Sequence, residues 1–99
     1  MNVRFHSLAE HELRDAEQYI EAHRPRWGAK FREQVDEALG FALSKPGRCI
    51  QTYGPMFCSV KVARFPYRIY YGWVGEWVVV YAVYHASRRE RAWVVRSTT

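Results

Sequence analysis

Several features that mark common protein classes are missing from this chain of 99 residues. The longest unbroken apolar run, residues 77–84, is too short to cross a bilayer, which takes about 20 residues in a helix. Residues 1–7 have no apolar stretch after Arg4, so we expect no secretory signal and no membrane association. Gly-rich phosphate motifs, a GxSxG elbow and HExxH are also absent. The familiar cofactor and hydrolase classes are therefore excluded, and no cofactor is predicted.

Cysteine is scarce as well, since Cys49 and Cys58 are the only two. They could form one disulfide, but without an export signal we expect both thiols to stay reduced in the cytoplasm. There is no CxxC pair, and the four histidines are scattered rather than paired at ligand spacing. We therefore predict no metal site.

Negative charge is nearly absent from the second half. Residues 1–44 hold six Lys and Arg against eight Asp and Glu, whereas residues 45–99 hold nine against two. The halves thus carry net charges of −2 and +7, and most of the cations are Arg. A small domain with so basic a half is expected to bind something anionic, either nucleic acid, an acidic protein partner, or both.

What is present suits a packed core, because 48% of the residues are hydrophobic and 16% are aromatic. Apolar residues recur every three or four positions over 9–20 and over 31–42, which predicts two amphipathic helices. A Ser-Leu-Ala-Glu capping box predicts that Ser7 caps the first helix, and Pro46-Gly47 ends the second. We expect the acidic residues of the first helix to be solvated: Glu10, Glu12, Asp15, Glu17 and Glu21.

The remaining segments have β character. Strands are predicted over residues 2–6, 56–65, 67–74 and 77–85. Residues 45–55, rich in Gly and Pro, are predicted as a loop, and Gly75-Glu76 as a two-residue hairpin turn. Residues 87–96 could form a short helix. The order βααβββ predicts a single α+β domain, residues 1–99, with an antiparallel sheet and the helical hairpin packed on one face.

Strand periodicity separates the two faces of this sheet. Ile69 lies on the face predicted to pack against the helices, whereas Arg68 and Tyr70 point outwards. Residues 77–85 are apolar on both faces, so this strand should be covered on both sides. Either a partner or another segment of the chain is expected across its far face.

Cations and aromatics are interleaved from residue 61 onwards. Cations neutralise phosphates and aromatic rings stack on unpaired bases, so this pattern suits single-stranded nucleic acid. The alternative is that most of the aromatics belong to the core and that the arginines are solvated. His85 ends a strand and could act as an acid or base near neutral pH. We favour a structural role, with its imidazole bonded to backbone.

Three segments carry a family resemblance. They are FPYRIYY at 65–71, VVVYAVYH at 78–85, and Arg88-Arg89 followed by Trp93. With the length and the element order, they strongly resemble the RelE/ParE superfamily, the toxins of bacterial type II toxin–antitoxin systems. The resemblance covers nearly the whole chain. It implies a RelE/ParE-like fold and a cytoplasmic toxin that arrests growth, a type of protein associated with plasmid stabilisation.

One branch of this superfamily, RelE-like, consists of ribosome-dependent mRNA endonucleases that use basic residues and a stacking aromatic. Two positions depart from that pattern, since Ser59 stands where a second lysine is expected and Val94 where a tyrosine is expected. The catalytic residues that this resemblance implies are Lys61, Arg68 and Arg88, with His85 and Trp93 as weaker candidates.

The other branch, ParE-like, inhibits DNA gyrase by protein contact and needs no hydrolytic residues. His85 resembles this branch, because RelE proteins tend to carry glycine there, so we favour the ParE-like interpretation. A third hypothesis is a non-toxic domain that binds nucleic acid or protein. The family implies a cognate antitoxin with an acidic C-terminal segment, bound in a hetero-oligomer. The residues expected to bind the target or the antitoxin are Arg64, Tyr70, Arg89, Arg91 and Arg96.

Overall fold

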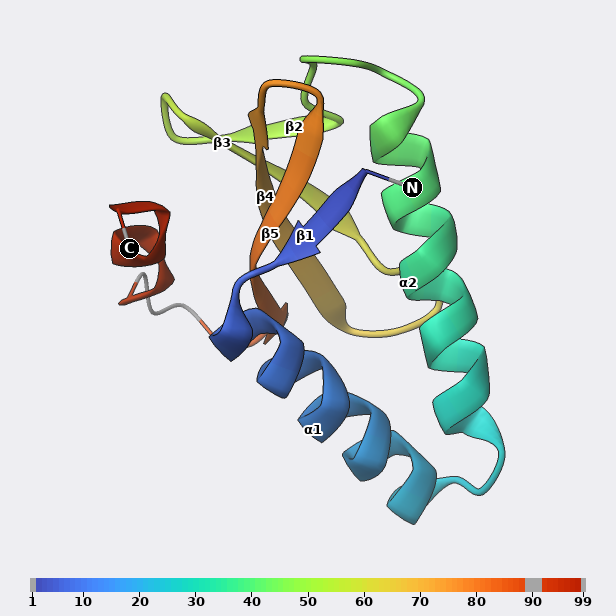
Figure 1. The fold of residues 1–99 in the computed structure, drawn as a ribbon. Coiled ribbons are helices and arrows are strands. Elements are labelled where there is room, and N and C mark those ends of the chain that lie inside the picture. Colours follow the sequence, from blue (N-terminus) through green and yellow to red (C-terminus); the bar gives the residue numbers. More distant parts are fainter. Residues whose placement is uncertain (1, 89–91, 99) are drawn as a thin grey trace.

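A computed structural model describes residues 2–88 and 92–98 and shows a helical hairpin beside a five-stranded sheet (Figure 1). The elements are β1 (Val3–Phe5), α1 (Ser7–His23), α2 (Trp27–Leu43), β2 (Gln51–Tyr53), β3 (Phe57–Lys61), β4 (Tyr67–Val74), β5 (Trp77–His85) and the 3-10 helix η1 (Ala92–Thr98). The predicted α+β class and the helical hairpin are confirmed. A short C-terminal helix is present but covers Ala92–Thr98 rather than 87–96, and the strand predicted over 56–65 ends at Lys61, before the turn that contains Arg64. One additional strand, β2, lies inside the segment predicted as a loop.

The sheet is mixed rather than antiparallel. Its strand order is β1-β5-β4-β3-β2, and β1 runs parallel to β5 while the other neighbours are antiparallel. Strand β1 pairs with β5, and the chain passes through both helices and three strands between the two. Apolar periodicity within a segment does not show whether such a pairing is parallel or antiparallel. The additional strand β2 forms because Gly54, at φ 65°, allows a tight turn that folds it back on β3.

Helix α1 begins with a cap different from the predicted one. Ser7 is the first helical residue, and the side chain of His6 supplies the cap: its Nδ1 accepts a hydrogen bond from Leu8 N at 3.1 Å. His6 has extended backbone (φ −57°, ψ 144°), as a cap residue requires. The capping-box prediction for Ser7 is therefore wrong by one residue, because an imidazole nitrogen takes the role usually given to a hydroxyl.

Helix α2 is capped from α1. Its N-cap residue, Arg26, has φ 76° and makes no side-chain capping bond. Instead the Glu21 carboxylate accepts hydrogen bonds from Arg26 N (2.8 Å) and Gly28 N (3.0 Å). A Cβ on residue 28 would come within 2.9 Å of Glu21 Oε1, so glycine permits this approach. The turn of the hairpin is thus fixed by one carboxylate.

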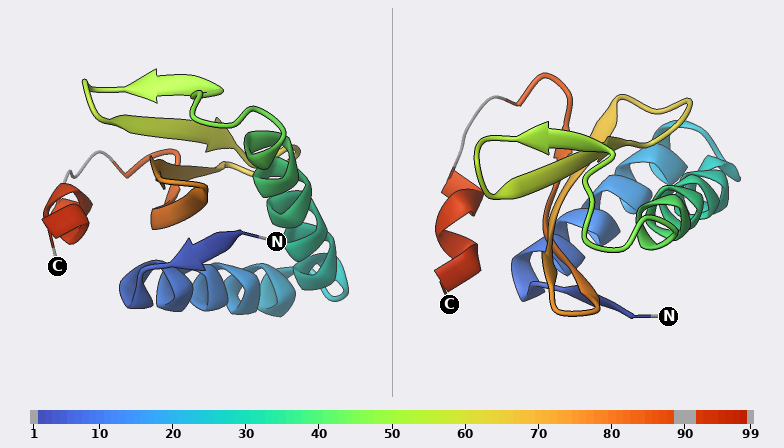
Figure 2. Two further views of the ribbon diagram at one scale, coloured as in Figure 1. Left: turned by 45° about the horizontal axis from the view of Figure 1, so that its top comes forward. Right: turned by 90° about the horizontal axis from the view of Figure 1, so that it is seen from above.

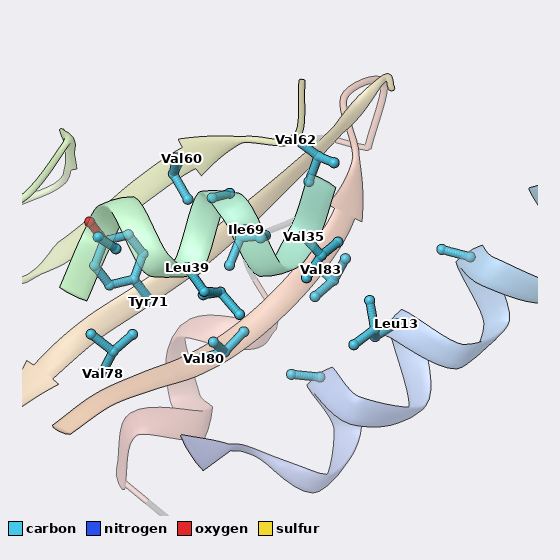
Figure 3. Close-up of a cluster of buried hydrophobic side chains, with 14 of the residues drawn as sticks. Leu13, Val35, Leu39, Val60, Val62, Ile69, Tyr71, Val78, Val80 and Val83 are labelled. Atoms are coloured by element: carbon cyan, nitrogen blue, oxygen red, sulfur yellow. The ribbon is translucent and has the colours of Figure 1, made fainter. Parts of the chain in front are cut away.

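The main core lies between the helices and the sheet (Figure 3). Leu13 of α1 and Val35 and Leu39 of α2 point towards the strands and are at most 3% exposed. Ile69 and Val80 meet them from the sheet and are fully buried. Each such side chain stabilises the fold by about 1.5–3 kcal/mol relative to exposure. The predicted inward face of Ile69 is confirmed.

A second apolar cluster lies on the opposite face, beneath η1. In Figure 2, η1 and the helical hairpin lie on opposite sides of the strands. Trp93 of η1 is fully buried and stacks on Tyr70, with 4.8 Å between ring centroids. Tyr81 and Tyr84 of β5 belong to the same cluster. The sequence predicts either a partner or another segment of the chain over the far face of β5. The structure shows a segment of the chain, η1, in that place.

A clamp between Glu12 and Arg96 fastens η1. Strand β1 pairs with β5 only over Val78–Val80, so the next part of that β5 edge has no strand beside it in the described chain. Glu12 accepts from Val83 N (3.1 Å), and the Arg96 guanidinium donates to Tyr81 O (2.8 Å) and to both oxygens of Glu12 (3.1 and 2.9 Å). The expectation of a solvated Glu12 is wrong, because the carboxylate satisfies an exposed strand edge.

A disulfide joins Cys49 to Cys58, so the expectation of two reduced thiols is also wrong. That expectation depended on the absence of an export signal alone. In the fold, Cys49 precedes β2 and Cys58 lies in the paired strand β3, which brings their Cα atoms 5.0 Å apart. This separation lies within the usual range for a disulfide. The bond ties the loop after α2 to the sheet.

Candidate functional site

Two predicted cations, Lys61 and Arg68, lie side by side on the sheet face that points away from the helices, and a third, Arg88, lies just past the end of β5. In the strand register, Lys61 of β3 lies opposite Arg68 of β4, and Arg68 lies opposite Tyr84 of β5. The Arg88 guanidinium sits over the Tyr84 ring, 3.9 Å from its centroid. We call Lys61, Arg68 and Arg88 the outer-face basic cluster. Arg88 also lines a pocket with Asp15 and Tyr19 of α1, so it lies where this face meets the helix side.

Two neighbours limit what this cluster can do. The Arg68 guanidinium donates a hydrogen bond to Gln51 Oε1 of β2, which holds that side chain against the edge strand. Ser59, at the position where a lysine was expected, is 2% exposed. A charge buried there would carry a large desolvation cost. The cluster therefore holds Lys61 and two arginines, with no second lysine.

The candidate stacking residue Trp93 is enclosed by aromatic rings. Tyr53, Phe57 and Tyr70 surround it with centroid distances of 5.4, 5.0 and 4.8 Å. Its indole N–H has no hydrogen-bond partner among the described residues. Burial also raises the pKa of the Tyr70 phenol above its ordinary value. With η1 in this place, Trp93 offers no face to a nucleotide base.

His85 lies on the helix side of the sheet, away from the Lys61–Arg68 pair. Its register partner is Tyr67, and the two rings meet edge to face with 5.2 Å between centroids. Ser87 N donates to His85 Nδ1 (3.1 Å), and Ser87 Oγ lies 2.7 Å from the same atom. Because Nδ1 accepts, the proton of the neutral imidazole sits on Nε2. This agrees with the structural role favoured for His85.

The residues expected to bind the target or antitoxin fall in different places. Tyr70 packs against the apolar cluster around Trp93, and Arg96 pairs with Glu12. Arg64 lies in the turn between β3 and β4, with φ 71°, on the helix side. Arg89 and Arg91 lie outside the described residues. Arg64, Tyr70 and Arg96, the three of these residues that the structure describes, therefore do not form one surface.

A cleft at the end of the helical hairpin contains residues that the sequence analysis did not single out. It has a volume of about 260 Å³. We call it the hairpin cleft, and its lining consists of Tyr19, Ile20, His23, Arg24, Trp27, Arg64, Phe65, Pro66, Tyr67 and His85. The Arg-Pro-Arg-Trp segment between the helices was the available signal, because it concentrates cations and a large aromatic in a short connection.

Residues 2–88 and 92–98 contain no group of three or more His, Cys, Asp or Glu side chains suited to a metal ion. Over the same residues, no helix is both long and apolar enough to span a membrane.

The family comparison agrees with this architecture. The family described as the ParE toxin of type II toxin-antitoxin system, parDE, matches residues 3–90. Because that match covers most of the chain, the chain belongs to this family of RelE/ParE-type toxins. The resemblance inferred from residues 65–71 and 78–85 is thus confirmed. Among curated proteins, none matches this chain.

Proposed function

We propose that this toxin arrests bacterial growth by inhibiting DNA gyrase through direct protein contact. The observation that carries the proposal is the state of the outer-face basic cluster. Phosphodiester cleavage needs positive charge together with a proton acceptor and an oriented base. Here Trp93 is buried, Arg68 is held by Gln51, and His85 lies on the other side of the sheet from Lys61 and Arg68. Such a surface is better suited to contact than to hydrolysis.

Arginine-rich contact surfaces recognise carboxylates through paired N–H donors. Lys61 and Arg88 are exposed, and the neighbouring Tyr84 fixes the position of the Arg88 guanidinium. These side chains could pair with acidic groups on a target without any bond being broken. The same chemistry would serve a cognate antitoxin with an acidic C-terminal segment, which would neutralise the toxin in a hetero-oligomer.

A supercoiling assay tests the gyrase proposal. Purified toxin should reduce the supercoiling of relaxed plasmid by gyrase in a dose-dependent way. Arg88→Ala should require more toxin for the same inhibition, because it removes one cation of the cluster. Arg14→Ala is the matched control, since it removes an exposed arginine from α1. Unimpaired supercoiling at excess toxin would contradict the proposal.

The second candidate is a ribosome-dependent mRNA endonuclease. The pairing of Lys61 with Arg68 favours it, together with the place of Arg88 over Tyr84, the register partner of Arg68, because neighbouring cations could stabilise the charge of a phosphodiester transition state. Primer extension on a translated message should then show cuts that depend on toxin induction and disappear with Arg88→Ala. A message that stays intact during growth arrest would exclude this candidate and leave gyrase inhibition.

A non-toxic binding domain is the third candidate. Expression of the chain without any partner should stop growth if either toxin hypothesis is right, and normal growth would favour the non-toxic domain. A small neighbouring reading frame with an acidic C-terminal half, able to restore growth when co-expressed, would support the toxin–antitoxin pairing. The two observations are independent of which target is inhibited.

A further inference from the structure

We propose that the Cys49–Cys58 disulfide is a redox switch that controls whether Arg68 is available on the outer face of the sheet. In the oxidised chain the bond holds β2 against β3, and β2 in turn holds the Arg68 guanidinium through Gln51. When a dithiol reduces the bond, the start of β2 opens from the sheet and Arg68 is released. The inference goes beyond the proposed function, because it concerns the chain by itself and holds for any target.

Strand β2 is weakly attached apart from this bond. It has three residues, lies at the edge of the sheet and is paired with β3 alone in the described chain. A short pairing of this kind is marginally stable in water. The disulfide joins residues 9 apart in sequence and encloses all of β2 in the resulting loop. A covalent closure of this kind removes most of the freedom of the open strand.

The other attachments of the segment before β2 are hydrogen bonds. Trp73 Nε1 donates to Arg48 O at 2.9 Å. Ile50 N donates to the Tyr71 hydroxyl at 3.3 Å, which is long for such a bond. Each bond of this type adds little net stability, since water replaces it when the segment opens. The disulfide is therefore the strongest constraint on the start of β2.

Gln51 connects this constraint to the outer face. It lies two residues after Cys49, and its side-chain Oε1 accepts a hydrogen bond from the Arg68 guanidinium. At the far end of β2, Tyr53 packs on Tyr70 with 5.0 Å between ring centroids, so that end has a contact of its own. Reduction therefore acts mainly on the Gln51 end, where the guanidinium is held.

Release of Arg68 changes what the outer-face basic cluster offers to a partner. In the register of β3 and β4, Arg68 lies opposite Lys61. A guanidinium freed from Gln51 adds its paired N–H donors to the charge of that lysine. Carboxylates accept such donors in pairs, so an acidic partner should bind the reduced chain more tightly. Oxidation would reverse this by returning Gln51 to its place.

The two sulfurs differ in access, which sets the order of the reaction. Cys58 is 3% exposed, whereas Cys49 is half-buried. A thiolate of the dithiol attacks Cys49 Sγ, the S–S bond breaks, and Cys58 leaves as a thiolate that takes up a proton. The second thiol of the reductant then attacks the mixed disulfide and releases Cys49 as a thiol. Two electrons and two protons pass to the toxin, and the dithiol becomes a cyclic disulfide.

The rest of the fold does not depend on this bond. Strands β3, β4 and β5 pair over their own lengths, and the main core lies between them and the helices. Opening of β2 is therefore expected to be local, as is usual for an edge element with few buried contacts. This locality is what separates a switch from a bond that the whole fold requires.

The test compares the full-length chain, made by cell-free synthesis, in oxidised glutathione and in dithiothreitol. Phenylglyoxal modifies accessible guanidinium groups, and mass spectrometry of peptides locates the modified arginines. Arg68 should react about five-fold faster in the reduced chain, whereas Arg14, exposed on α1, should react equally in both. Amide hydrogen exchange over residues 51–53 should become about ten-fold faster on reduction, with α1 unchanged.

Two variants separate the contact from the bond. Gln51→Ala removes the acceptor, so Arg68 should react at the fast rate in both buffers while the disulfide still forms. Its control is Gln18→Ala, an exposed glutamine on α1, which should keep the redox difference. Cys49→Ala removes the bond but leaves the buried Cys58 thiol in place. It should match the reduced wild type in either buffer.

Three results would overturn the inference. The first is a disulfide that dithiothreitol leaves intact in the folded chain, or that does not form again in oxidised glutathione. The second is an opened bond with no change at Arg68 or residues 51–53 beyond that of Arg14 and α1. The third is faster exchange throughout both helices, which would make the bond a requirement of the whole fold. None of these measurements involves gyrase, so a failure of the gyrase proposal would be distinct.

Discussion

The clamp between Glu12 and Arg96 determines whether the C-terminal segment stays on the sheet. Replacing Arg96 by Met keeps an extended apolar stem but removes every guanidinium donor. The Glu12 carboxylate, with its side chain 16% exposed, then loses its cationic partner, and Tyr81 O loses its hydrogen bond. We expect η1 to detach and Trp93 to become exposed to water.

The magnitude follows from the burial of the pair. Breaking a buried ion pair by removing one partner costs about 3–5 kcal/mol. The two side chains are 11% and 16% exposed, so we expect the lower end, about 3 kcal/mol, for Arg96→Met. Glu12→Gln retains an acceptor for Val83 N and should cost about half as much. The double variant should cost less than the sum, because neither charge is then left unpaired.

Urea unfolding followed by circular dichroism measures the global free energy. Acrylamide quenching of tryptophan fluorescence, compared with that of a Trp93→Phe variant, reports the exposure of Trp93 among the chain's four tryptophans. Arg14→Met is the control, because Arg14 is exposed on α1, and it should stay within about 0.5 kcal/mol of wild type. If Arg96→Met changed neither the unfolding free energy nor the quenching, the argument that this clamp holds η1 would be refuted.

Three further perturbations test separate parts of the structure. Glu21→Ala removes the carboxylate that caps α2 and should lower stability by about 1 kcal/mol, measured by urea unfolding. Cys49→Ser with Cys58→Ser removes a disulfide that closes a short loop and should cost about 2–3 kcal/mol in the same assay under non-reducing conditions. Burial raises the pKa of Tyr81 above 10.0, so the unfolded chain ionises first and stability should fall as the pH rises above about 10. Tyr81→Phe should reduce that alkaline loss.

Each of these predictions has its own control. Glu33→Ala removes an exposed carboxylate from α2 and should leave stability unchanged, so an equal loss in both variants would contradict the capping role of Glu21. Dithiothreitol should destabilise wild type but not the double serine variant. If wild type were indifferent to it, the disulfide would contribute nothing. An alkaline stability profile that is identical with and without Tyr81→Phe would show that this phenol does not ionise on unfolding.

Local periodicity predicted the parts of the fold that repeat along the chain. The helices over 9–20 and 31–42 and the inward face of Ile69 follow from apolar spacing, because each element buries one side. The hairpin turn at Gly75-Glu76 follows equally from local chemistry, and Gly75 has φ 60°. The sequence also grouped Lys61, Arg68 and Arg88 as candidates, although only the strand register shows that Lys61 lies beside Arg68.

Features that depend on distant partners were missed. The direction of β1, the pairing of β2 and the disulfide all need contacts between segments that local patterns treat separately. The same applies to the hairpin cleft, whose walls come from α1, α2 and the turn before β4. Glu12 looked solvated because its role depends on Arg96, 84 residues away.

By itself, the sequence determined the helical hairpin, the strand-rich second half, the −2 and +7 division of charge and the family, because these are properties of local spacing and composition. The tertiary structure decided which charges remain available. It paired Arg96 with Glu12, covered the outer sheet with Trp93, and left Lys61 and Arg68 on the opposite side of the sheet from the hairpin cleft. The physical reason is that burial and pairing depend on where distant segments meet, and an isolated segment carries no record of that.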